Sequence, residues 1–129
     1  MNKQSGFTLI ELVIVIVLLG VLAAIAVPRF INLEDEAQAA ALGANRAAIV
    51  SALNINYAGC ALNQHTPGTD CVAVADCGQA GGTLSGGLPS GYTIASLALP
   101  AGNGSTGTCV LTQTSTTNTA SFAAIRAGT

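Results

Sequence analysis

Residues 6–28 read GFTLIELVIVIVLLGVLAAIAVP and form the longest apolar stretch of the chain. From Phe7 to Val27, which is 21 residues, the only polar side chains are those of Thr8 and Glu11. A helix rises about 1.5 Å per residue, so a stretch of this length crosses the roughly 30 Å hydrocarbon core of a membrane. The stretch therefore predicts a membrane-spanning helix.

The composition of the whole chain limits its classes of function. Only 8% of the 129 residues are charged, the formal net charge is -2, and an ordinary globular domain has about 25% charged residues. A weakly acidic chain offers no basic surface to a phosphate backbone, so we expect no direct nucleic-acid partner. From Ala58 onward Gly, Ser, Thr, Ala and Asn dominate, which predicts a soluble head.

The first residues are not typical of an ordinary secretory signal peptide. Such a signal ends in a small-residue cleavage site that is followed by a polar mature start. Here Ala24-Ile25-Ala26 continues into the apolar Val27. We therefore expect the apolar stretch to stay in the mature protein.

The motif Gly6-Phe7-Thr8-Leu9-Ile10-Glu11, with a short basic leader before it and an aliphatic run after it, resembles the class III signal of type IV pilins and the related pseudopilins. The resemblance implies a pilin-like fold. It implies that a prepilin peptidase removes a leader of residues 1–6 by cutting between Gly6 and Phe7, and that the new amine of Phe7 is methylated. Residues 7–28 would then form the transmembrane and filament-core helix, and residues 29–129 the globular head, including the second half of the helix.

A second, weaker resemblance rests on residues 28–37, PRFINLEDEA, which are similar to pilins of the mannose-sensitive haemagglutinin type. The same segment contains the charge run Glu34-Asp35-Glu36, with Arg29 and Arg46 as the nearby cations. A solvated helix face explains this run most simply.

Glu11 is an acid within an apolar helix, and burying its charge in a bilayer costs a few kcal/mol. Cleavage after Gly6 creates a positive amine on Phe7, which a neighbouring subunit in a helical bundle would present to Glu11. The two charges neutralise each other only when the register between subunits is correct, so we assign Glu11 to assembly, as the resemblance also implies. Alternatively, Glu11 lies near the membrane interface and reaches headgroup water.

Beyond the apolar stretch an Ala-rich segment continues to Tyr57, so we predict one helix over residues 7–57. Its core-facing positions follow a partial helical period and comprise Leu33, Leu42, Ile49 and Leu53.

Gly20 and Pro28 interrupt this predicted helix. Pro28 removes a backbone hydrogen bond, so we expect a kink near Val27, whereas Gly20 costs about 1 kcal/mol relative to Ala. The resemblance implies that the stretch between them loses helical structure during filament assembly. The alternative is that both are residues that membrane helices tolerate.

The rest of the chain predicts a small antiparallel sheet that packs on the second half of the helix, an α+β fold. We expect three or four strands. Patterns that favour β-structure lie at residues 92–99, 108–113 and 119–126, and a turn is expected at residues 100–104.

Four cysteines lie in the expected head: Cys60, Cys71, Cys77 and Cys109. An even number in a small exported domain predicts two disulfides, for which three pairings are open. Of these we predict Cys60 with Cys71 and Cys77 with Cys109. The spacings lack paired Cys-x-x-Cys motifs, so we expect no zinc, no other metal and no cofactor.

No pattern indicates catalysis. His65 is the only histidine, Asp70 and Asp76 are typical turn formers, and the Gly-rich residues 78–91 lack the lysine of a phosphate loop. The Ser/Thr-rich residues 104–121 are either exposed hydroxyls of a sheet and its turns or a surface for O-glycosylation or ligand contact.

We therefore predict a non-enzymatic structural subunit of a type IV pilus that supports adhesion, motility or surface attachment. Its expected partners are identical subunits in a helical homopolymer, prepilin peptidase, the inner-membrane pilus assembly machinery and, before assembly, the bacterial inner membrane; the finished pilus is extracellular. The alternatives are a pseudopilin of a type II secretion system, a minor or DNA-uptake pilin, and a membrane-anchored glycan-binding module. The head lacks the acidic cluster expected of a calcium-binding major pseudopilin.

Overall fold

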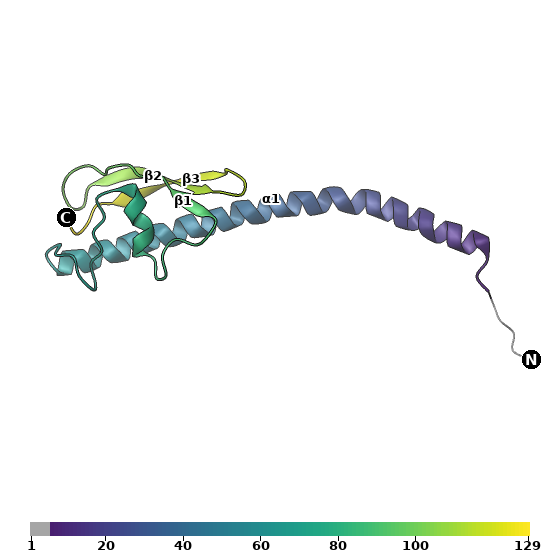
Figure 1. Cartoon of the computed structure of the whole chain (residues 1–129), viewed down its shortest axis with the longest axis horizontal. Coiled ribbons are helices and arrows are strands. Elements are labelled where there is room, and N and C mark those ends of the chain that lie inside the picture. The colour runs from purple at the N-terminus through teal and green to yellow at the C-terminus, as the bar shows by residue number, and fades with distance from the viewer. Residues whose placement is uncertain (1–5) are drawn as a thin grey trace, which may run out of the picture. The chain divides into compact units, whose positions relative to one another are not determined.

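The computed structural model describes residues 6–129 and has the predicted α+β fold, a long amino-terminal helix followed by a small antiparallel sheet (Figure 1). The elements in chain order are α1 (Leu9–Leu62), the 3₁₀ helix η1 (Cys77–Thr83), β1 (Tyr92–Ile94), β2 (Thr106–Gln113) and β3 (Thr119–Ile125). The chain divides into two compact units, the first ending at Gln38 and the second comprising Ala39–Thr129. Helix α1 contributes residues to both.

The second unit contains a sheet with the strand order β1-β2-β3. Both pairings are antiparallel, with Tyr92 opposite Gln113 and Thr106 opposite Ile125. Side chains alternate between the two faces of a strand, so alternate residues of β2 and β3, such as Leu111 and Phe122, are buried. Figure 1 shows these strands lying along the later turns of α1.

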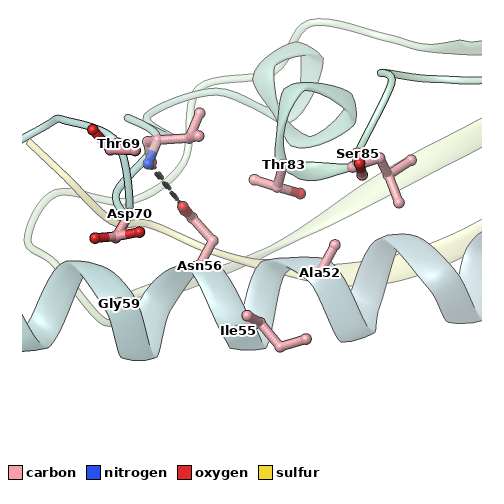
Figure 2. Close-up of a pocket in the computed structure, with 10 residues that line it drawn as sticks. Ala52, Ile55, Asn56, Gly59, Thr69, Asp70, Thr83 and Ser85 are labelled. Carbon is pink, nitrogen blue, oxygen red and sulfur yellow. Dashed lines mark hydrogen bonds between the residues drawn. The ribbon is translucent and has the colours of Figure 1, made fainter.

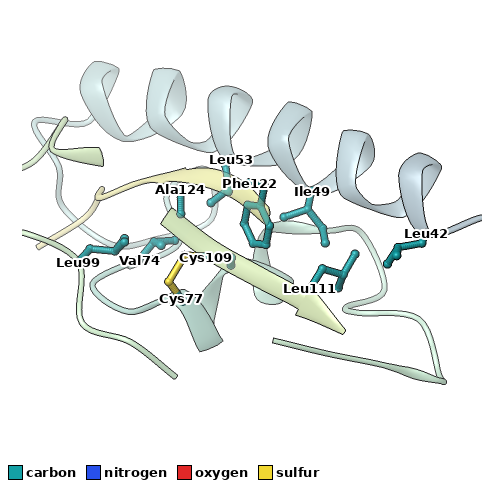
Figure 3. Packing of buried hydrophobic residues seen from close by; sticks show 11 residues of the cluster. Leu42, Ile49, Leu53, Val74, Cys77, Leu99, Cys109, Leu111, Phe122 and Ala124 are labelled. Atoms are coloured by element: carbon teal, nitrogen blue, oxygen red, sulfur yellow. A yellow bond between two sulfur atoms is a disulfide. The ribbon is translucent and has the colours of Figure 1, made fainter. Parts of the chain in front are cut away.

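The core of the second unit lies between α1 and the inner face of the sheet (Figure 3). On α1, Leu42, Ile49 and Leu53 recur at helical spacing and are buried, as predicted. Opposite them lie Val74, Cys77, Ala80, Leu99, Cys109, Leu111, Phe122 and Ala124. Leu33 is the fourth residue expected in the core. This prediction is wrong, because Leu33 lies in the first unit and is 58% exposed.

Two element boundaries differ from the prediction. Helix α1 continues past Tyr57 to Leu62, so that Cys60 lies in its last turns and is buried. Strand β1 is shorter than predicted because the segment after Ile94 bonds to another partner. The Cys77 N–H donates to the carbonyl oxygen of Leu97 at 2.9 Å, so this segment pairs with the start of η1 instead of extending the sheet.

The second unit carries two disulfides. One joins Cys60 of α1 to Cys71 in the following loop, with a Cα–Cα distance of 4.5 Å. The other joins Cys77 of η1 to Cys109 of β2, with a Cα–Cα distance of 5.5 Å. Each is expected to contribute about 2–4 kcal/mol of stability, which matters in a head with few aromatic residues.

Candidate functional site

The start of α1 is fixed by reciprocal hydrogen bonds between Thr8 and Glu11. The backbone N–H and the hydroxyl of Thr8 donate to Glu11 Oε2 at 2.9 and 2.8 Å. In return, the Glu11 N–H donates to Thr8 Oγ1 at 3.4 Å. This arrangement is a capping box, which satisfies backbone donors that the first turn of a helix leaves unpaired. Glu11, expected to act in assembly, therefore holds a local partner within its own chain.

The apolar side chains that surround and follow the capping box of Thr8 and Glu11 are exposed. Every large apolar side chain from Phe7 to Phe30 is at least 43% exposed. The helix is long and apolar enough to cross a membrane, judged by length and composition. An apolar surface of this extent is far larger than soluble monomers expose, so it is suited to contact lipid or other helices.

Gly6 and Phe7, the expected cleavage pair, precede α1 in a segment without regular secondary structure. Phe7 is 88% exposed. A scissile bond outside a helix presents its backbone to a peptidase. The remaining residues of the expected leader, 1–5, lie outside the described part of the chain.

Gly20 and Pro28 both lie inside α1, which is helical on either side of them. A Cβ atom added at Gly20 would meet no other atom within 4 Å, so packing in the single chain does not require glycine there. A role for these residues in helix distortion within a filament stays a prediction.

In the second unit, a groove of about 470 Å³ opens between α1, the loop that follows it and the end of η1 (Figure 2). Its floor is formed by Ala52, Asn56 and Gly59 of α1. Asn56 is buried and bonds to both backbone polar groups of Val72, which fixes one wall. A methyl group at position 59 would overlap the carbonyl oxygen of Asp70, so glycine permits this close approach.

The polar residues weighed as catalytic candidates have structural partners or lie apart. The Gly128 N–H points to His65 Nδ1 at 3.4 Å, and the His65 ring lies 5.5 Å from that of Tyr57. Asp76 caps η1, and its carboxylate accepts hydrogen bonds from the Gly78 N–H and from the Ser96 hydroxyl, both at 2.7 Å. Within residues 6–129, no group of three His, Cys, Asp or Glu side chains is placed to hold a metal ion.

Two features of the chain were missed by the sequence reasoning although their signals are present. The spacing Thr8-x-x-Glu11 is that of a capping box, and Asp76-x-x-Gln79 forms a second one at η1. The short η1 helix itself was not predicted, because its sequence is rich in glycine. The groove depends on contacts between distant segments, for which the sequence has no local signal.

A long apolar helix and a compact unit of helix, sheet and disulfides agree with the pilin-like fold that the sequence predicts. The family described as the prokaryotic N-terminal methylation motif matches residues 1–27. The chain is 57% identical over 53 residues to the type IV narrow pilus major component of Thermus thermophilus, covering 41% of this chain and 46% of that protein.

Other relatives come from pili and from a secretion system. The type IV major alpha-pilin of Moraxella bovis is 46% identical over 57 residues, 41% of this chain and 36% of that protein. The type II secretion system core protein G of Pseudomonas aeruginosa is 43% identical over 54 residues, 42% of this chain and 38% of that protein.

The chain spans less than half the length of each of these relatives. No solved structure matches it. The motif and the pilin relatives together support the resemblance to type IV pilins. The haemagglutinin-type subclass stays a prediction.

Proposed function

We propose that this protein is the structural subunit of a type IV pilus and polymerises through the apolar part of α1. The observation that carries the proposal is the exposed apolar part of α1, most of which lies within the matched methylation motif of residues 1–27. In lipid this surface anchors the subunit in the inner membrane, and in a filament the same surface packs against the helices of other subunits. Such a role requires contact surfaces and no catalytic residue.

Processing precedes assembly in this proposal. A prepilin peptidase cuts between Gly6 and Phe7, and the Phe7 amine becomes methylated. The exposed, non-helical position of Phe7 supports access by both enzymes. The inner-membrane assembly machinery then extracts the mature chain from the bilayer into an extracellular filament that supports adhesion, motility or surface attachment.

Glu11 would act as the register-setting residue. In the single chain its carboxylate is held by Thr8, so its charge is partly compensated within the membrane. In the filament the positive amine of Phe7 from a neighbouring subunit pairs with it. A misplaced subunit would leave both charges unpaired in an apolar interior, so the pairing selects one axial position. Loss of helix between Gly20 and Pro28 would let neighbouring helices adjust to that position.

Intact-mass analysis of filaments sheared from cells tests the proposal. The expected species begins at a methylated Phe7 and carries two disulfides, and a strain without prepilin peptidase should yield none. Filaments that contain no such chain would contradict the proposed function.

A second candidate is a subunit of a type II secretion system, favoured by the similarity to core protein G. Deletion of the gene separates the two. Loss of surface pili with intact protein secretion supports the pilus subunit, whereas loss of secretion with intact pili supports the second candidate.

A further inference from the structure

The groove between α1 and the following loops is apolar on several sides and carries one charged side chain. Its lining residues share an origin in three segments of the second unit: Ala52, Ile55, Asn56 and Gly59 from α1; Thr69, Asp70 and Val72 from the loop after it; and Thr83, Leu84 and Ser85 at the end of η1. Ile55 is 71% exposed and Val72 is 37% exposed, so apolar surface remains open to solvent here.

Asp70 is the only charged residue of this lining. It is exposed, and its carboxylate accepts no hydrogen bond from any side chain or backbone group within residues 6–129. In Figure 2, Asp70 lies at one end of the groove and Thr83 and Ser85 lie at the other. The groove therefore suits a ligand that combines one cation with an adjoining apolar group.

The chain itself has one arginine that matches this description. Arg46 Nε donates to the carbonyl oxygen of Ser121, and Arg126 donates to Leu99 O and Thr129 Oγ1. Arg29, by contrast, makes no hydrogen bond or ion pair with the residues that the structure describes.

Arg29 is also flanked by apolar side chains that need cover. Phe30 is 71% exposed and Leu33 is 58% exposed on the same stretch of α1. An amphipathic helix segment of this kind binds in apolar grooves through anchors spaced three or four residues apart. The cation and the apolar anchors of this segment are complementary to the carboxylate and the apolar walls of the groove.

We propose that this groove binds residues 29–33 of a second copy of the chain, with the Arg29 guanidinium against the Asp70 carboxylate and Phe30 against the apolar walls. The inference rests on the proposed function, because it requires polymerisation. The two halves of the contact are different surfaces of one chain, so each copy can accept one neighbour and be accepted by another. Such a heterologous contact propagates into an open helical filament instead of closing as a dimer. An arginine and a carboxylate can form two parallel hydrogen bonds, which fixes orientation as well as charge.

Disulfide trapping between copies tests this contact in intact filaments. Cells would co-produce one chain with Arg29→Cys and a differently tagged chain with Asp70→Cys, so that a mixed dimer reports only contacts between copies. Mild oxidation should yield the mixed dimer. The control replaces Asp70→Cys with Ser115→Cys, an exposed position in the turn between β2 and β3 outside the groove, and should yield at least tenfold less.

A charge exchange supplies a second measurement. Asp70→Arg and Arg29→Asp should each reduce filament yield several-fold, and the double variant should restore most of it. Filaments that form normally but give no excess of the 29–70 dimer over the control would overturn the groove contact and leave the proposed function standing. Absence of any filaments from the unaltered chain would overturn both.

Discussion

The side chain of Asn56 bonds to both backbone polar groups of Val72. Asn56 Nδ2 donates to the Val72 carbonyl oxygen at 2.9 Å, and Asn56 Oδ1 accepts from the Val72 N–H at 2.8 Å. Asn56 is only 8% exposed, so both bonds are partly shielded from bulk water. One residue of α1 thus holds the loop that carries Asp70 and Cys71 against the helix.

Asn56→Ala should destabilise the second unit by about 1–3 kcal/mol, because it removes two partly buried hydrogen bonds to the backbone of Val72. Asn54→Ala is the matched control. Asn54 is exposed and bonds only to Val50 O of its own helix, so its replacement should change stability by less than about 0.5 kcal/mol. Urea unfolding of the detergent-solubilised chain, followed by pulse proteolysis, measures both, and equal midpoints for the two variants would contradict the assignment.

The main elements of the fold could be predicted because their signals are local. The apolar run and the Ala-rich segment indicated α1, β-favouring residues indicated β2, and alternating side chains indicated β3. The end of β1 could not be predicted, because Leu97 bonds to Cys77, a residue distant in the sequence. The prediction that Leu33 lies in the core was wrong, because helical periodicity identifies an apolar face without indicating whether another element covers that face.

In the candidate site, too, features with a local sequence signal could be predicted and features without one could not. Glu11 could be found because an acid in an apolar run is conspicuous in the sequence. Its hydrogen bonds to Thr8 also had a local signal in their three-residue spacing. The groove around Asp70 had none, because it is created by the bonds of Asn56 and by the turn that follows η1.

Glu11→Gln should leave processing after Gly6 intact but lower the yield of filaments. The amide can still accept a hydrogen bond from Thr8, but it cannot neutralise the Phe7 amine of a neighbour. An unpaired charge in an apolar interior costs about 3–5 kcal/mol, which is a factor of about a hundred or more in subunit affinity. Intact mass reports processing, and immunoblotting of sheared filaments reports yield. Thr8→Val, which retains the carboxylate of Glu11, is the control and should reduce filament yield much less. An unchanged filament yield for Glu11→Gln would contradict the pairing of Glu11 with the Phe7 amine.

The carboxylate of Asp76 should make the second unit sensitive to acid. The Ser96 hydroxyl and then the Gly78 N–H donate hydrogen bonds to it, and these lower its pKa from the ordinary value near 4. The folded chain therefore binds this proton less tightly than the unfolded chain does. The carboxylate stabilises the fold above the unfolded pKa, and this contribution is lost as the pH falls through the folded pKa.

Asp76→Asn should consequently lower the urea midpoint at pH 7, and its difference from the unaltered chain should shrink at pH 3. Asp35→Asn, which changes an exposed acid of α1 in the first unit, is the control and should show no such convergence. A constant difference between Asp76→Asn and the unaltered chain from pH 7 to pH 3 would argue against this role for the carboxylate.

Replacing each of two glycines of α1 by alanine should change the stability of the fold in opposite directions. A Cβ atom at Gly59 would overlap the Asp70 carbonyl oxygen, whereas one at Gly43 would meet nothing within 4 Å. Gly59→Ala should therefore destabilise the fold by about 1–3 kcal/mol, because the loop must move away from the helix. Gly43→Ala should stabilise it by up to about 1 kcal/mol, because alanine is the better helix former. Both changes add one methyl group to the same helix, so their common effect on helix propensity cancels when their urea midpoints are compared. Midpoints that shift in the same direction would show that the loop does not contact position 59 closely.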